Sequence, residues 1–385
     1  MEFGIFVQGH VSKNRLAREG DQAEHNSIMG DAELVRLADG HRWKYAWITE
    51  HHFLTEYSHL SASDVFLGYC AATTERIHLG SGIFSFNPRK DHPARIAERV
   101  AMLDHMTDGR FEFGTGRGAG SREVTGFDIE STDATRPIWD EVMREIPKMW
   151  GDEEYSYNGT SFHIPYPGHA IPTRNVLPKI WKKPHPPLWV AAGNPATFEK
   201  AAGMGLGVLA FTTRAIPDMK PLVDVYKERI QSAEPVGAYV NDNVMITTGM
   251  VCLEDGKKAR EAVTKMGIVY LQSLVYYYHD TIPPPEGATK WPDSAPEPDL
   301  EQVEWMIENG YLICGSPDEC AEQIAALDTT GIDQLVFGMP IDLPWDQAVE
   351  TVELFGDRVI PQFDPDPVPK SARARDAAAA AAVSA

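Results

Sequence analysis

The chain has 385 residues, of which 43% are hydrophobic, and its formal net charge is −21 at pH 7. One α/β barrel often fills a chain of this length, and the hydrophobic content supports a large core. The acidic balance argues against nucleic acids and anionic membranes as partners, because both are bound through clustered lysine and arginine.

The four cysteines are scattered without a C-x-x-C pair, which favours reduced thiols over a disulfide framework. The first residues, MEFGIFVQGH, lack the basic and apolar regions of a signal peptide. No run approaches the roughly 18 apolar residues of a membrane span. We therefore expect a cytoplasmic globular protein.

Short apolar runs are predicted to be β-strands, and helix-like segments alternate with them. Most runs are apolar on both faces, which is typical of parallel strands buried between a core and surrounding helices. The predicted strands are Glu2–Val7, Tyr45–Thr49, His78–Ser85, Phe111–Gly116, Leu188–Ala192, Gly207–Phe211, Val244–Leu253 and Gln334–Gly338. Eight such alternations fit a (β/α)8 TIM barrel, whose active site lies at the carboxyl ends of the strands. A doubly wound open sheet is the alternative fold.

Two irregular stretches interrupt this alternation. Residues 155–183 are rich in aromatic residues, proline and glycine, and residues 281–300 contain too many prolines for a helix or a strand. Long loops of this kind in compact domains are often lids, although a plain surface excursion is the alternative for residues 281–300. We predict one domain over residues 1–363, followed by a low-complexity tail, residues 364–385, that adds nothing to the core.

Two adjacent histidines, His51 and His52, follow the second predicted strand in the segment WITEHHF. Histidine titrates near neutral pH and therefore suits general acid–base catalysis or metal binding. In a barrel, this position lies on the catalytic rim. The alternative is that one ring hydrogen-bonds the backbone and the other faces water.

A glycine-rich segment, FEFGTGRGAG, ends the fourth predicted strand and includes Gly116 and Arg117. Glycines let a planar or anionic ligand approach the backbone, and the arginine fork suits phosphate. The alternative is a glycine-rich bulge with a solvated arginine. Gly80 and Gly82, in the third predicted strand, suggest either close approach to a ligand or a kink needed for barrel closure.

The segment LWVAAGNPATFEKAAGMG predicts an anion site after the fifth strand. Gly193 ends the strand, Asn194 is a good N-cap, Pro195 suits the first helical position, and Thr197 lies in the first turn. Backbone N–H groups and the positive end of the helix dipole face outward at such a start. Most helix starts of this kind bind only water. Here the helix start at Asn194 and the glycine-rich segment with Arg117 both follow strands, and together they favour a phosphorylated cofactor lying across the barrel mouth.

Several long segments resemble the bacterial luciferase-like flavin-dependent monooxygenases. They include WITEHHF, HLGSGIFSFNPRKDHPARIAERVAMLDHMTDGRFEFGTGRG, RPIWDEVMREIPKMW, YSYNGTSFHI, LWVAAGNPATFEKAAGMGLG and GSPDECAEQIAALDTTGIDQLVFGMP. The resemblance implies a TIM barrel that takes reduced FMN from a separate flavin reductase. It also implies reaction with dioxygen and insertion of one oxygen atom into an aldehyde, ketone or similar small organic substrate. A homo-oligomer is expected from the same resemblance.

The resemblance also assigns roles to individual residues. His51 matches the catalytic histidine beside the flavin ring, where it would assist proton transfer. The residues of this chain that match the family's contacts to the FMN phosphate are Arg117, Gly193, Asn194 and Thr197.

Gly82–Ile83 matches a non-prolyl cis peptide under the flavin ring. Gly116 occupies the place of the reactive cysteine of luciferase proper, which favours a non-luminescent oxygenase.

Three alternatives stay open at the level of the sequence. Relatives of this barrel bind a deazaflavin coenzyme and transfer hydride without activating dioxygen. Glu50, His51 and His52 would also suit a metal-dependent hydrolase barrel, but the H-x-H pattern expected on the first strand is missing, so no metal ligand is assigned. Retention of His51 argues against a third alternative, a non-catalytic flavin-binding subunit.

Overall fold

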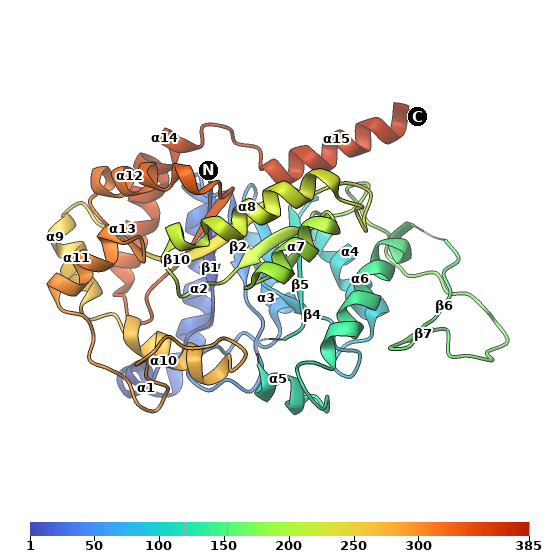
Figure 1. Cartoon of the computed structure of the whole chain (residues 1–385), viewed down its shortest axis with the longest axis horizontal. Coiled ribbons are helices and arrows are strands. Elements are labelled where there is room, and N and C mark those ends of the chain that lie inside the picture. The colour runs from blue at the N-terminus through green and yellow to red at the C-terminus, as the bar shows by residue number, and fades with distance from the viewer. Residues whose placement is uncertain (119, 152, 385) are drawn as a thin grey trace.

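The computed structural model describes residues 1–118, 120–151 and 153–384, and its centre is a closed parallel barrel (Figure 1). The strands pair in the order β10, β12, β1, β2, β3, β5, β8 and β9, and β9 then pairs with β10. This closure confirms the TIM barrel and rules out the open sheet. The barrel strands are β1 (Glu2–Val7), β2 (Tyr45–Ile48), β3 (His78–Ser81), β5 (Phe111–Gly116), β8 (Leu188–Ala191), β9 (Gly207–Ala210), β10 (Val244–Cys252) and β12 (Gln334–Gly338).

Every predicted strand is present in the structure. The barrel sheet also contains one strand that the sequence pattern does not predict. The third predicted strand is divided after Ser81, and its second part is the short β4 (Phe84–Ser85), which pairs with β5. The additional strand β11 (Leu312–Gly315) pairs only with the last residues of β10, Gly249 to Cys252. It therefore extends the sheet beyond the closed cylinder.

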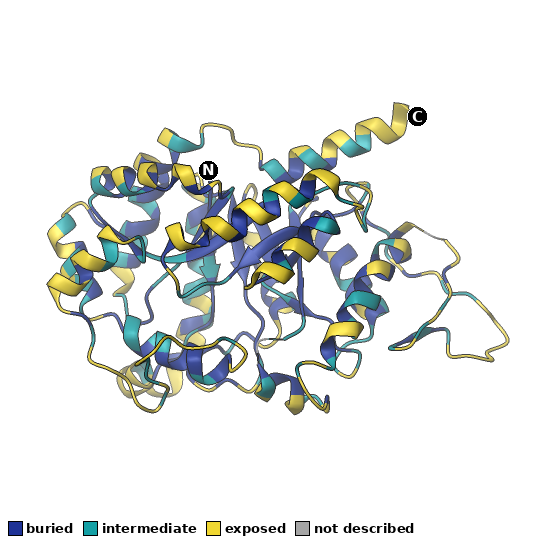
Figure 2. Ribbon diagram, in the orientation of Figure 1, coloured by how far each residue is buried: buried dark blue, intermediate teal, exposed yellow. Residues whose placement is uncertain are grey.

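Helices surround the barrel, and their exposed residues face outward from the buried strands (Figure 2). None of the helices in the described ranges has the length and apolar character needed to cross a bilayer. The helices are α1 (Lys13–Glu19), α2 (Ala23–Gly40), α3 (Ser63–Thr73), α4 (Pro93–Met106), α5 (Ser121–Gly126), α6 (Thr135–Gly151), α7 (Pro195–Gly203), α8 (Lys220–Arg229), α9 (Gly256–Val263), α10 (Ile268–Tyr278), α11 (Leu300–Glu308), α12 (Pro317–Ala326), α13 (Trp345–Leu354), α14 (Ile360–Phe363) and α15 (Lys370–Ser384).

The barrel interior is filled by large aromatic side chains. Trp47 and Trp189 are fully buried and meet edge to face, with ring centroids 5.1 Å apart. Glycines on neighbouring strands make room for them: a β-carbon on Gly80 would lie 2.3 Å from Cε3 of Trp47, and one on Gly207 would lie 2.4 Å from Cε3 of Trp189. Gly80 is therefore required by packing inside the barrel. The barrel is a solid core and leaves ligands to its ends.

The amino-terminal end of the barrel is closed by a polar network that includes the chain's tail. The fully buried Glu112 is hydrogen-bonded by Nδ1 of His78 at 2.8 Å, Nε1 of Trp189 at 2.7 Å and Oγ of Ser371 at 2.6 Å. Arg375 donates to the carbonyl of Gly109 at 2.5 Å.

The expectation that the tail adds nothing to the packed structure is wrong for its first turns. Ser371, Ala372 and Arg375 are buried, because they face this polar network at the barrel base. The remaining turns of α15 extend away from the barrel (Figure 1). The domain boundary at residue 363 stays a prediction.

The two irregular stretches have different surroundings. Residues 155–183 contain the antiparallel pair β6 (Tyr157–Asn158) and β7 (His163–Ile164) and project to one side of the barrel (Figure 1). The proline-rich loop instead packs on α10, where the Trp291 N–H donates to the Ser273 carbonyl at 3.1 Å. Glu297 accepts hydrogen bonds from the Val269 and Tyr270 N–H groups at 3.2 and 3.1 Å. The loop therefore covers part of the carboxyl end of the barrel, where α10 lies.

Substitution of Gly80 by alanine tests the packing of the interior. The added methyl group would overlap the Trp47 ring, and overpacking of this kind costs typically about 1–3 kcal/mol. We expect Gly80→Ala to lower the free energy of unfolding by about that amount in urea denaturation. Gly40→Ala is the matched control, because a β-carbon there meets no atom within 4 Å. Equal stability of the two variants would contradict this account of the barrel interior.

Candidate active site

His51 lies at the carboxyl end of the barrel, three residues after β2. Its backbone N–H donates to the Leu60 carbonyl at 3.1 Å, and the residue is buried, with only 8% of its surface exposed. The ring meets the rings of Tyr57 and His279 edge to face, at centroid distances of 5.3 and 5.4 Å. Nδ1 of His51 lies 3.6 Å from Oε2 of Glu123, on α5. This nitrogen has no hydrogen-bond partner among the described residues.

His279 belongs to the same cluster and is not identified by the sequence analysis. It is the C-cap of α10, and its Nε2 is buried without a hydrogen-bond partner among the described residues. Burial, together with the nearby His51, lowers the pKa of His279 to about 3, so its ring is neutral at neutral pH. Phe211 stacks on its other side at a centroid distance of 5.9 Å. The neutral imidazole of His279 therefore lies against His51.

The neighbouring residues Glu50 and His52 form a separate ionic cluster. Glu50 accepts a hydrogen bond from Ser63 Oγ at 2.6 Å and is paired with Lys90, and His52 Nε2 lies 3.4 Å from Glu50 and 3.2 Å from Lys90. Burial opposes ionisation of Glu50, but His52, Lys90 and Ser63 outweigh it and lower the pKa of Glu50 to about 2. The two adjacent histidines thus have different environments. His51 packs against Tyr57 and His279, whereas the His52 ring meets Phe127 edge to face at a centroid distance of 4.8 Å.

The third strand breaks at a cis peptide bond between Gly82 and Ile83, as the family resemblance implies. The Gly82 N–H donates to the Ile48 carbonyl at 2.7 Å, which ties the bend to the end of β2. Ile83 lies against Gly116 on β5, because a β-carbon on Gly116 would be only 2.6 Å from Ile83 Cδ1. A cysteine at this position would displace Ile83. The glycine therefore follows from local packing.

The two predicted phosphate contacts lie at the ends of adjacent strands. Thr115 on β5 is paired with Val190 on β8, so Arg117 and Gly193 follow these strands at the same rim. Arg117 Nη1 donates to the Thr132 carbonyl at 3.1 Å and to Thr135 Oγ1 at 3.3 Å. Burial lowers the pKa of its guanidinium, and Arg136 adds to the effect, although the group stays charged.

The start of α7 has the predicted geometry. Asn194 Oδ1 accepts a hydrogen bond from the Thr197 N–H at 3.1 Å, and Pro195 occupies the first helical position. Thr197 Oγ1 accepts from the Gly193 and Asn194 N–H groups at 3.3 and 3.2 Å. These bonds satisfy three backbone N–H groups of the turn, those of Gly193, Asn194 and Thr197, and thereby shape it. Gly193, Asn194 and Pro195 are exposed and Thr197 is half-buried. A β-carbon on Gly193 would meet no atom within 4 Å, so space for a ligand lies in front of the turn.

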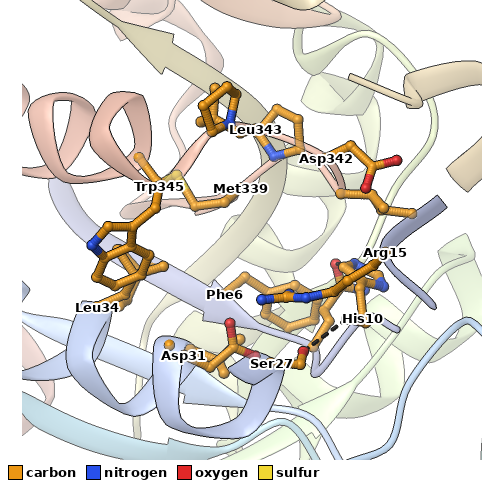
Figure 3. Close-up of a pocket in the computed structure, with 18 of the residues that line it drawn as sticks. Phe6, His10, Arg15, Ser27, Asp31, Leu34, Met339, Asp342, Leu343 and Trp345 are labelled. Atoms are coloured by element: carbon orange, nitrogen blue, oxygen red, sulfur yellow. Dashed lines mark hydrogen bonds between the residues drawn. The ribbon is translucent and has the colours of Figure 1, made fainter. Parts of the chain in front are cut away.

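A cavity of about 480 Å³ lies beside the mouth, between the ends of β1 and β12 and the helices α1, α2 and α13 (Figure 3). Its lining is mostly apolar, with charged groups on one side. Burial raises the pKa of Asp31 to about 6 and lowers the pKa of His10 to about 4. His10 and the mouth are connected through Tyr57, whose carbonyl lies 2.6 Å from His10 Nδ1. Neither of the two irregular stretches, residues 155–183 and 281–300, lines this cavity.

No group of three or more histidine, cysteine, aspartate or glutamate residues that would hold a metal ion occurs in the described part of the chain. The titratable groups at the mouth are instead arranged as the His51 cluster and the Glu50 ion-pair cluster. The site is therefore organised around aromatic rings, a bent strand and an exposed helix start.

The chain belongs to the luciferase-like monooxygenase family, whose pattern matches residues 1–334, and this membership makes it an oxidoreductase of the oxygen-incorporating class. The alkanal monooxygenase alpha chain of Photorhabdus luminescens is 24% identical over 383 residues, covering 94% of this chain and 96% of its own. The FMN complex of the oxygenating constituent of 3,6-diketocamphane monooxygenase from Pseudomonas putida has a TM-score of 0.72 at 18% identity, covering 94% of this chain and 98% of that one. The coenzyme F420-dependent tetrahydromethanopterin reductase of Methanopyrus kandleri has a TM-score of 0.64 at 20% identity, covering 94% of this chain and 100% of that one.

The Glu50 cluster predicts a specific acid sensitivity. Because the folded-state pKa of Glu50 is below its ordinary value of 4.5, its ionised form stabilises the folded protein above that value, and this contribution is lost as the pH falls toward 2. Between about pH 5 and pH 2, we expect the free energy of unfolding of the native chain to fall by about 3 kcal/mol more than that of Glu50→Gln. Urea unfolding at a series of pH values measures this, with the exposed Glu301→Gln as control. Parallel pH profiles for all three proteins would contradict the interpretation.

Proposed function

We propose that the protein is a flavin-dependent monooxygenase that uses reduced FMN and dioxygen to oxygenate a small aldehyde, ketone or similar molecule without light emission. The observation that carries the proposal is the placement of three features at one end of the barrel. His51 follows β2, the cis peptide follows β3, and the Arg117 and Asn194 turns follow β5 and β8. One extended cofactor lying across the mouth would reach all three.

The residues present fit such a cofactor. The open space before Gly193 and the charge of Arg117 would hold its phosphate, with Thr197 fixing the turn and Asn194 capping the helix. The bend at Gly82–Ile83, beside the side-chain-free Gly116, would support the planar ring. When bound, the reduced flavin supplies the electrons with which dioxygen is split between the substrate and water.

His51 is the group best placed to hold or move a proton at the ring. Its Nδ1 faces Glu123 at 3.6 Å, and the neutral His279 and Tyr57 rings enclose it. Such burial limits the access of water, which would otherwise divert the activated oxygen to hydrogen peroxide. We propose that His51 controls protonation while the surrounding rings exclude solvent.

We propose a separate flavin reductase as partner, as the family resemblance implies. Support comes from the diketocamphane enzyme, which is the oxygenating constituent of its system. A homo-oligomer is proposed from the family resemblance alone.

Deazaflavin-dependent hydride transfer is the second candidate function. It is favoured by the similarity to the reductase that depends on coenzyme F420. The two candidates differ in the coenzyme bound and in the use of dioxygen. Parallel titrations with FMN and the deazaflavin separate them, because tight binding of the deazaflavin alone would replace the monooxygenase proposal.

Variants of the phosphate contacts test where the cofactor binds. We expect Arg117→Ala and Thr197→Val each to weaken FMN binding by about 10- to 150-fold, since a hydrogen bond to a charged group contributes about 1.5–3 kcal/mol. Quenching of flavin fluorescence gives the dissociation constants. Arg136→Ala is the matched control, because this nearby arginine is exposed and pairs with Asp133. Dissociation constants unchanged in both variants would remove these residues from the site.

Substitution of His51 tests its catalytic role. We expect His51→Gln to bind FMN normally but to oxidise reduced FMN with release of hydrogen peroxide in place of oxygenated product, with coupling reduced about 10²-fold or more. Product and peroxide are quantified together over a panel of ketones and aldehydes supplied with reduced FMN. His52→Gln is the control, because that ring belongs to the Glu50 cluster. Undiminished coupling in His51→Gln would contradict the assigned role.

A further inference from the structure

Most charged groups around the cavity beside the mouth already have partners. Glu19 accepts hydrogen bonds from Nε of Arg15 at 3.3 Å and from Nη2 of Arg18 at 3.0 Å. Both oxygens of Asp342 accept hydrogen bonds from side chains at the start of α1. Both ring nitrogens of His10 lie within hydrogen-bond distance of an oxygen atom. These groups are therefore occupied and do not call for a ligand.

Two lining residues of opposite charge keep free groups. Asp31, on α2, accepts a hydrogen bond from the Gly9 N–H at 3.0 Å through one oxygen, and its other oxygen has no partner among the described residues. Arg15, on α1, uses only Nε, which leaves its two terminal nitrogens unbonded within the described chain. Both side chains point into the cavity beside Phe6 (Figure 3), yet no nitrogen of Arg15 lies within 4.0 Å of an oxygen of Asp31. A gap for a ligand group thus separates a free cation from a free carboxyl group.

The rest of the cavity offers an apolar wall. Side chains of α2, of α13 and of the segment between β12 and α13 form it, namely Leu34, Leu343, Trp345, Ala348 and Val352. The volume of about 480 Å³ is within the range of small-molecule sites. The cavity therefore combines a pair of opposite charges with room for an apolar group.

We propose that this cavity is a second ligand site, separate from the flavin site, and that its ligand is an α-amino acid with an apolar side chain. The carboxylate of the ligand would accept hydrogen bonds from the two terminal nitrogens of Arg15, a geometry that suits the guanidinium fork. Its ammonium group would donate to the free oxygen of Asp31, and its side chain would lie on the apolar wall. A ligand with a single charge would leave Arg15 or Asp31 without a partner, which is costly in apolar surroundings.

This site is distinct from the place of the proposed oxygenation. The ring of Phe6 lines the cavity, and its Cε2 lies 3.6 Å from the position that a β-carbon on Gly82 would occupy. The Phe6 ring consequently stands between the cavity and the bend at Gly82–Ile83. An amino acid held here would be bound without reaching the flavin, so the inference does not depend on the proposed function.

Calorimetric titration of the full chain with three matched probes tests the inference. L-Phenylalanine has both charges, whereas 3-phenylpropionate lacks the ammonium group and 2-phenylethylamine lacks the carboxylate. We expect phenylalanine to bind at least about tenfold more tightly than either analogue, because only phenylalanine pairs with both Arg15 and Asp31. Glycine, which has no side chain for the apolar wall, should also bind at least about tenfold more weakly than phenylalanine.

Variants assign the preference to individual residues. In Asp31→Asn, phenylalanine should lose its advantage over 3-phenylpropionate, and in Arg15→Met it should lose its advantage over 2-phenylethylamine. Gly30, on α2, supplies a matched pair, because a β-carbon there would lie 3.6 Å from Cζ3 of Trp345. Gly30→Ala fits this space and should bind phenylalanine as the native chain does, whereas Gly30→Leu fills part of the cavity and should bind at least about tenfold more weakly.

Thermal unfolding of each variant separates loss of the site from loss of the fold. A preference for phenylalanine in the native chain that disappears in the corresponding folded variants would support the inference. No binding of phenylalanine, equal affinity for the three aromatic probes, or equal affinity in Gly30→Ala and Gly30→Leu would overturn it. If Asp31→Asn fails to fold, the probes on the native chain and the Gly30 pair decide. FMN titration of the same samples tests the proposed function separately.

Discussion

The contact on which the architecture depends is the packing of Trp47 against Trp189 inside a barrel whose neighbouring strands carry glycine. A closed eight-stranded cylinder has an interior that side chains just fill. Two indoles fit there because Gly80 and Gly207 leave space for them. The interior is consequently solid, and the chain's chemistry is confined to the ends of the cylinder.

The two ends of the barrel are built for different purposes. At the amino-terminal end, Glu112 is fully buried and hydrogen-bonded from three directions, and the tail helix contributes one of these bonds through Ser371. Both oxygens of Glu112 are therefore bonded, although the buried Gln334 Nε2 and Asp364 Oδ2 at this end have no hydrogen-bond partner among the described residues. At the carboxyl end, His51 and His279 keep unbonded nitrogens within the described structure, and the turn at Gly193 faces open space. Unsatisfied polar groups at this end are consistent with a ligand that completes them.

Much of this organisation is local and could therefore be predicted from the sequence. Strand positions follow from apolar runs, and the start of α7 follows from Asn194 and Pro195, because caps and strand propensity depend on neighbouring residues. The family resemblance located the cis peptide at Gly82–Ile83. The roles of the predicted site residues toward a flavin stay predictions.

Features that depend on distant contacts could not be predicted in this way. His279 is 228 positions beyond His51 in the chain, and only the packing of α10 over the mouth brings the two rings together. The tail gave no periodic signal because only a few of its residues, such as Ser371 and Arg375, face the barrel. The strand β11 is short, and it exists because the end of β10 offers unpaired backbone groups. The sequence left two explanations for Gly80 equally open, a kink in the strand and close approach to a ligand. The structure shows that position 80 is a glycine because the indole of Trp47 occupies the space where a β-carbon would lie.

A crystal structure of the chain with FMN bound tests the central claim most directly. We expect the phosphate within hydrogen-bond distance of Arg117 or the Gly193–Thr197 turn, and the flavin ring against Gly82–Ile83 with its edge beside His51. Electron density for FMN at the barrel base, in the cavity near Trp345, or with its phosphate away from α7 would contradict the account.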